Sequence, residues 1–125
     1  MTNKVLLGIQ VIAGLMLIVF GLNKFLHFIP MGEPAPAMGE YMGALFKTGF
    51  LFPLIAVIEI LAGLAFVSNK FAALMAVIVM PVMVNAFLAH LFLDPAGIGG
   101  ATFIIAVIVI VMVRYRDRYK EIFKA

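Results

Sequence analysis

The sequence predicts an all-α integral membrane protein, a four-helix bundle with a short interfacial helix in its first outer loop. Hydrophobic residues make up 66% of the 125 residues and charged residues only 12%, whereas soluble domains average roughly 45–50% apolar and about 25% charged residues. The apolar residues also gather in four runs, each near the length of about 20 residues that a membrane helix needs. A soluble fold this small could not bury so much apolar surface, because its ratio of surface to volume is too high.

The four apolar runs are expected to be helices, because they lack the alternation of barrel strands and only helices or closed barrels satisfy the backbone in lipid. The first run is a retained span rather than a signal peptide, since residues 5–22 exceed the roughly 7–15 apolar residues of a signal sequence. A basic turn separates the second and third runs, and an Asp-Pro turn separates the third and fourth. The predicted spans are residues 5–28, 50–67, 71–93 and 98–113.

The first outer loop, residues 29–49, is interrupted by prolines and glycines. Its first half is expected to be irregular. In its second half, Met38, Tyr41, Met42 and Leu45 have the spacing of one helix face. We therefore predict a short interfacial helix over residues 37–46 that lies on the membrane, with a disordered loop as the alternative.

The placement of lysine and arginine predicts the orientation. Four crossings put both termini on one side, and seven of the nine basic residues fall there. The positive-inside rule makes that side cytoplasmic, so the loop 29–49 faces outward from a bacterial inner membrane. The basic tail, residues 114–125, is expected to continue the fourth helix out of the membrane and to meet anionic lipid. The seven basic residues are Lys4, Lys70, Arg114, Arg116, Arg118, Lys120 and Lys124.

Composition also narrows the chemistry. The chain has no cysteine, which excludes thiol catalysis, disulfide exchange, iron–sulfur clusters and Cys-ligated zinc. No metal site is predicted. The basic tail directly follows a membrane span, so no nucleic-acid partner is expected. The expected partners are the lipid bilayer and either another protein subunit or a second copy of this chain.

The candidate site is a polar cluster in the outer half of the bundle. Ionisable residues within a membrane are costly and therefore point to function. Glu59 lies about 13 Å inside the second span at about 1.5 Å per residue, and Asn85 lies at a matching depth in the third. Lys24 can reach inward from the outer end of the first span, so we predict a Lys24–Glu59 ion pair completed by Asn85. The candidate residues are Asn23, Lys24, His27, Glu59, Asn85 and His90.

A structural role for this cluster is the alternative, since buried polar groups can fix helix register. The inner half of the helices is predicted to hold no polar side chain. Gly14, Gly21 and Gly63 are small residues on helix faces, and we expect them to let helices pack closely.

Three motifs occur in a fixed order: Gly21-x-x-Lys24, Pro53-x5-Glu59-x3-Gly63 and Asn69-Lys70. In the order, spacing and length of these elements, residues 5–113 resemble the DoxX family of small four-helix bacterial membrane proteins. The name-giving members of that family are small subunits of a thiosulfate:quinone oxidoreductase. The resemblance implies a small membrane subunit or accessory protein of a redox system, in which Lys24 and Glu59 match the polar positions of the family pattern.

Under this hypothesis the bundle offers a lipid-accessible pocket for a quinone. Glu59, with Lys24 or His27, would move protons, because quinone oxygens need proton donors close by. A quinone is the candidate cofactor, while a haem held by His27 and His90 is not favoured. Two alternatives stay open: a non-enzymatic membrane anchor or assembly partner, and a small transporter or lipid-binding protein.

Overall fold

The computed structural model describes residues 3–30 and 32–125, and within them every regular element is a helix. Four helical units are long and apolar enough to cross a membrane. They are α1, α3, α4, and the continuous unit formed by η1 and α5. The chain thus has the all-helical architecture and the four apolar helices of a multi-pass membrane protein, as its sequence predicts. The elements are α1 (Asn3–Leu26), α2 (Pro36–Lys47), α3 (Leu51–Ser68), α4 (Ala72–Leu93), η1 (Pro95–Gly97), α5 (Ile98–Arg114) and η2 (Arg116–Tyr119).

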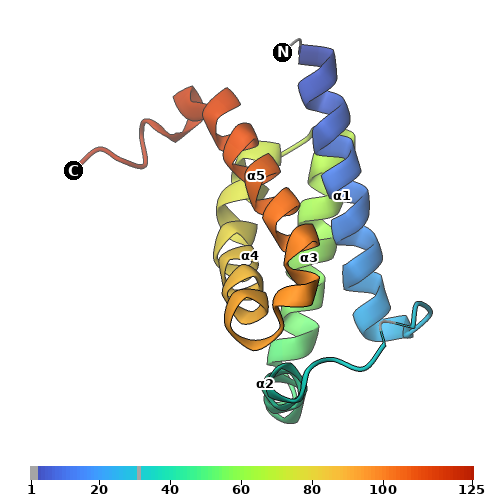
Figure 1. The fold of residues 1–125 in the computed structure, drawn as a ribbon. Helices are drawn as coiled ribbons and strands as arrows, with labels where there is room; N and C mark the ends of the chain where they lie inside the picture. Colours follow the sequence, from blue (N-terminus) through green and yellow to red (C-terminus); the bar gives the residue numbers. More distant parts are fainter. Residues whose placement is uncertain (1–2, 31) are drawn as a thin grey trace.

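The four long helices stand side by side, and α2 lies across one end of the bundle, against α3 and α4 (Figure 1). Both chain termini lie at the opposite end (Figure 1). We call these two ends the α2 end and the terminal end. Large apolar side chains such as Leu64 and Leu74 are about half exposed on the outside of the bundle, which suits a surface that faces lipid rather than water.

Glycine allows α1 and α3 to pack with their backbones almost in contact. A Cβ atom added to Gly14 would lie 2.8 Å from the Gly63 carbonyl oxygen, and one added to Gly63 would lie 2.6 Å from the Gly14 carbonyl oxygen. Gly21 meets the Ala56 carbonyl oxygen in the same way, at 2.9 Å. The packing role predicted for these three glycines is confirmed, since any larger residue would push the helices apart.

The short helix predicted in the outer loop is present as α2, one residue longer at each end than expected. Pro36 opens it, as suits a first helical turn, and Gly49 follows it with a positive φ of 80°. The face that carries Met38 and Tyr41 points into the bundle and lines a cavity there. The apolar side of α2 therefore covers the end of the bundle.

The terminal end holds a buried amide, and the prediction of a wholly apolar inner half is wrong. The Gln10 side chain is only 1% exposed, and its Nε2 donates to the Phe66 carbonyl at 3.0 Å and to Asn69 Oδ1 at 2.9 Å. Phe66 lies in the last turn of α3, where carbonyl groups lose their helical partners. Gln10 satisfies one of these carbonyls and so ties α1 to the end of α3.

The tail does not continue the last long helix, so that expectation is also wrong. Helix α5 ends at Arg114, and the tail turns aside from the bundle (Figure 1). Two tyrosine hydroxyls tie the turned tail to the bundle: Tyr115 donates to Asn69 Oδ1 at 3.0 Å and Tyr119 to the Ala73 carbonyl at 2.6 Å. Burial raises the pKa of the Tyr119 hydroxyl above its ordinary value.

Candidate functional site

A partly open cavity of about 250 Å³ lies at the α2 end, lined by residues of all four long helices and of α2. Most of its wall is apolar and rich in methionine, including Phe20, Met38, Met42, Ile55, Val82 and Met83. Its polar side chains come from four different helices: Lys24, Tyr41, Glu59, Asn85 and His90. The structure therefore gathers four of the six predicted site residues around one cavity and adds Tyr41.

The predicted ion pair between α1 and α3 is present. Lys24 Nζ lies 2.7 Å from Glu59 Oε1, and the glutamate side chain is 5% exposed against 22% for the lysine. A separation this short is that of a charge-assisted contact between an ammonium group and a carboxylate. The carboxylate thus keeps acceptor capacity at the cavity wall.

The aromatic ring of Phe52 lies near the lysine. Nζ of Lys24 lies 6.0 Å from the centroid of the Phe52 ring, at the outer reach of a cation–π contact. Phe52 in turn meets Phe46 of α2 edge to face, with centroids 6.2 Å apart. The start of α3 and the end of α2 therefore meet beside the lysine of the ion pair.

Asn85 does not complete the ion pair, contrary to prediction. Its Nδ2 donates to the hydroxyl oxygen of Tyr41 on α2. The prediction compared only the depths of Glu59 and Asn85 in their two spans. It did not foresee that α2 covers the cavity and brings Tyr41 closer to Asn85 than the ion pair. Because the Tyr41 oxygen accepts this bond, its own hydrogen can be donated elsewhere.

His90 belongs to the cavity wall near the turn between α4 and α5. Its Nδ1 lies 3.4 Å from the Asp94 carbonyl oxygen, and Gly97 packs directly against the ring. The Asp94 carboxylate accepts a bond of 3.1 Å from the backbone N–H of Ala35. This bond joins the turn to the start of α2 and holds the cover over the cavity.

Asn23 and His27, the other two predicted residues, lie outside the cavity. Asn23 is buried and pairs with the backbone of Ile29 on both sides: it accepts from the N–H at 2.8 Å and donates to the carbonyl at 3.2 Å. His27 is exposed and follows α1 with a φ of 51°. Both residues shape the turn that ends α1, and the structure does not bring His27 together with His90.

Sequence reasoning missed the roles of Tyr41 and Asp94. Tyr41 was predicted on the correct face of a helix, but the partner of that face depends on where α2 folds. Asp94 was identified only as part of a turn, and its bond to Ala35 joins residues far apart in the chain. Neither contact has a local signal, because each depends on α2 folding back over the bundle.

The cavity combines an apolar interior with a few directed polar groups, which is the pattern of a small-molecule site. Lys24 and Tyr41 can donate hydrogen bonds to a ligand, and Glu59 can accept them. No group of three or more potential metal-ligating side chains comes together in the part of the chain that the structure describes. Comparisons with protein-family models, curated proteins and solved structures gave no match.

Proposed function

We propose that the chain is a DoxX-like membrane protein whose cavity binds the ring of a lipid-soluble quinone, as a small subunit or accessory protein of a redox system. The observation that carries the proposal is the Lys24–Glu59 pair in the wall of an otherwise apolar cavity. An ion pair removed from water is costly. A ligand with polar atoms would form hydrogen bonds with these two charged side chains.

The size of the cavity supports a ring-sized ligand. Its volume of about 250 Å³ is slightly below the roughly 300–1,000 Å³ of pockets for drug-sized molecules. A quinone ring fits that volume, while its isoprenoid tail would remain in the lipid between helices. The methionine and aromatic lining suits a flat, polarisable ring.

The polar groups supply the protons that quinone chemistry needs. Reduction of a quinone takes up two electrons and two protons, and proton donors must stand close to its oxygens. Lys24, Tyr41 and His90 line the cavity together with the Glu59 carboxylate. His90 therefore replaces His27 as the histidine that we propose to move protons, because His90 lines the cavity and His27 does not. The electrons would come from a partner protein in the same membrane.

The setting we propose is a bacterial inner membrane with both termini in the cytoplasm. Seven of the nine basic residues belong to the terminal end, which the positive-inside rule assigns to the cytoplasm. The α2 end, with the proposed quinone cavity, then lies in the outer half of the membrane.

Quinone binding to the purified full chain tests the proposal. We expect saturable binding of a short-chain quinone in mild detergent and co-purified quinone in lipid extracts, both measured by mass spectrometry. Glu59→Gln should weaken binding about tenfold, equal to about 1.4 kcal/mol. Glu40→Gln is the matched control, because Glu40 is exposed on α2 and outside the cavity lining.

Other outcomes would favour the alternatives. If no quinone binds at any concentration, while Glu59→Gln only lowers the melting temperature, the pair is a structural brace and the chain fits a membrane anchor. If lipid extracts of the wild type hold a different small molecule that Glu59→Gln releases, the cavity belongs to a lipid-binding protein or transporter.

A further inference from the structure

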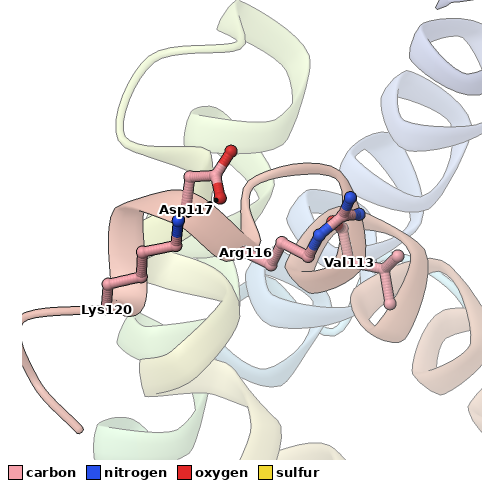
Figure 2. A network of polar contacts seen from close by, with 4 residues as sticks. All are labelled: Val113, Arg116, Asp117 and Lys120. Atoms are coloured by element: carbon pink, nitrogen blue, oxygen red, sulfur yellow. Dashed lines mark hydrogen bonds and ion pairs between the residues drawn. The ribbon is translucent and has the colours of Figure 1, made fainter.

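The positively charged residues of the tail fall into two groups: lysines that pair with acidic residues, and arginines that do not pair with acidic residues in the part of the chain that the structure describes. Lys120 Nζ pairs with Asp117 Oδ1 at 3.1 Å, and Lys124 Nζ pairs with Glu121 Oε1 at 3.1 Å. Figure 2 shows the first of these pairs and Arg116 turned back toward Val113, whose carbonyl accepts from its Nη1 at 3.3 Å. The tail's two acidic residues are thus occupied by the lysines, and its arginines lack acidic partners among the described residues.

Two of these arginines, Arg114 and Arg118, meet at one aromatic ring. The guanidinium carbon of Arg118 lies 4.3 Å from the centroid of the Tyr115 ring, and that of Arg114 lies 5.2 Å from it. Both guanidinium groups therefore lie against the Tyr115 ring. The shared ring thus places two positive charges in the same part of the terminal end.

The ring itself is held in place by the bundle. Its hydroxyl donates to Asn69 Oδ1 at 3.0 Å, and the same oxygen accepts from Gln10 Nε2 at 2.9 Å. Arg114 Nη1 reaches Gln10 Oε1 at 3.5 Å. These bonds join α1, the α3–α4 turn and the end of α5 around the two arginines. Lys70, the next residue of that turn, adds a further positive charge.

We propose that Arg114 and Arg118 form a binding site for a phosphate group, supplied by the head group of an anionic phospholipid. Guanidinium groups suit this role because they bind phosphate oxygens through paired N–H donors and stack on aromatic rings at the same time. Basic sites between membrane helices near the water interface are known to hold such head groups.

The position of the site favours lipid over free phosphate. Arg114 is the last residue of the fourth apolar helix, so the site lies at the level where the hydrocarbon region gives way to head groups. Beyond it, Ile122 and Phe123 are 72% and 83% exposed. Such exposure suits side chains that rest among lipid chains beside a head group.

The test uses the full chain in neutral detergent, with bound lipid counted by native mass spectrometry. Arg118→Gln removes a charge whose described contact is the Tyr115 ring, while Lys120→Gln removes an equal charge that is paired with Asp117. We expect Arg118→Gln to weaken binding of phosphatidylglycerol about fivefold, as the loss of about 1 kcal/mol per basic residue implies. Lys120→Gln should leave it unchanged, and Arg118→Lys should fall between wild type and Arg118→Gln.

Further arms identify the source of the phosphate and guard against misfolding. Phosphatidylcholine, which is zwitterionic, should bind weakly in every variant. If inorganic phosphate binds with the same dependence on Arg118, the site stands but its ligand is free phosphate. If Arg118→Gln and Lys120→Gln weaken lipid binding equally, only overall charge matters and the proposal is overturned. Unchanged lipid binding in Arg118→Gln, at an unchanged melting temperature, overturns it as well.

Discussion

At the scale of single residues, the two members of the Lys24–Glu59 pair stand in different surroundings. The glutamate side chain is 5% exposed, whereas the lysine is 22% exposed on a long flexible chain. A lysine that loses its partner can turn toward the interface. A glutamate that loses its partner remains enclosed among apolar side chains, so the cost of breaking the pair depends on which residue is removed.

We expect Lys24→Met to destabilise the chain by about 3 kcal/mol, at the lower limit for an uncompensated buried charge. Glu59→Gln should cost less, because the amide is uncharged and Lys24 can reorient. The double variant should be more stable than Lys24→Met alone. Thermal unfolding of the wild type, the two single variants and the double variant in one detergent measures these differences in stability. If the effects of the two single substitutions simply add in the double variant, Lys24 and Glu59 are not coupled.

Gln10 offers a second prediction at this scale. Gln10→Leu keeps the size of the side chain but leaves the Phe66 carbonyl and Asn69 without its amide. We expect a loss of about 1–2 kcal/mol, since hydrogen bonds between membrane helices are worth this much or less. Quinone binding at the far end should not change. A measurable fall in quinone affinity would show that the two ends of the bundle are coupled.

At the scale of helices, α1 depends on glycine only where it meets α3. A Cβ atom at Gly14 would lie 2.8 Å from the Gly63 carbonyl oxygen, whereas one at Gly8 would meet no atom within 4 Å. We therefore expect Gly14→Ala to lower the melting temperature. Gly8→Ala should leave it unchanged or raise it, because alanine favours a helix by about 1 kcal/mol over glycine. Equal effects of the two substitutions would mean that helix propensity, and not packing, decides the outcome.

Helix α2 is the element whose position matters most for the cavity. It is tied to the bundle by the Tyr41–Asn85 and Ala35–Asp94 bonds, and it is flanked by Gly32 and Gly49 with positive φ. We expect α2 to swing aside about these two glycines when a ligand enters.

A disulfide between α2 and the α4–α5 turn tests this movement. The chain has no cysteine of its own, so Ala35→Cys with Asp94→Cys gives a single possible bridge. We expect the oxidised protein to exchange bound quinone more slowly than the reduced protein, with an unchanged amount bound at equilibrium. If oxidation leaves the exchange rate unaltered, the ligand enters between the long helices instead.

At the scale of the whole molecule, the apolar runs determine the architecture. The four long helices could be predicted because their signal is local: each is a continuous apolar segment of the length that a bilayer requires. The Lys24–Glu59 contact was predictable too, because a long lysine side chain at the outer end of one span can reach inward to a carboxylate that lies deeper in the next.

Contacts that form only where the chain folds back on itself could not be predicted from the sequence. The hydrogen bond between Asn85 and Tyr41 needs α2 to fold back across the bundle, and Tyr119 reaches Ala73 only because the tail turns aside. Gln10 was overlooked for another reason: a single amide hardly changes the hydropathy of a long apolar run, although its two hydrogen bonds lock one end of the bundle.

The two ends of the bundle also differ in charge, and this difference yields a prediction about topology. The terminal end carries most of the lysine and arginine, and the α2 end carries the cavity and its cover. A single cysteine can report on each side: Thr48→Cys follows α2, and Lys124→Cys lies in the tail. With the terminal end in the cytoplasm, a membrane-impermeant maleimide should label Thr48→Cys in intact cells and Lys124→Cys only after lysis. The opposite pattern would invert the proposed orientation. Labelling of both cysteines in intact cells would place α2 and the tail on the same side, which contradicts three membrane crossings by α3, α4 and α5.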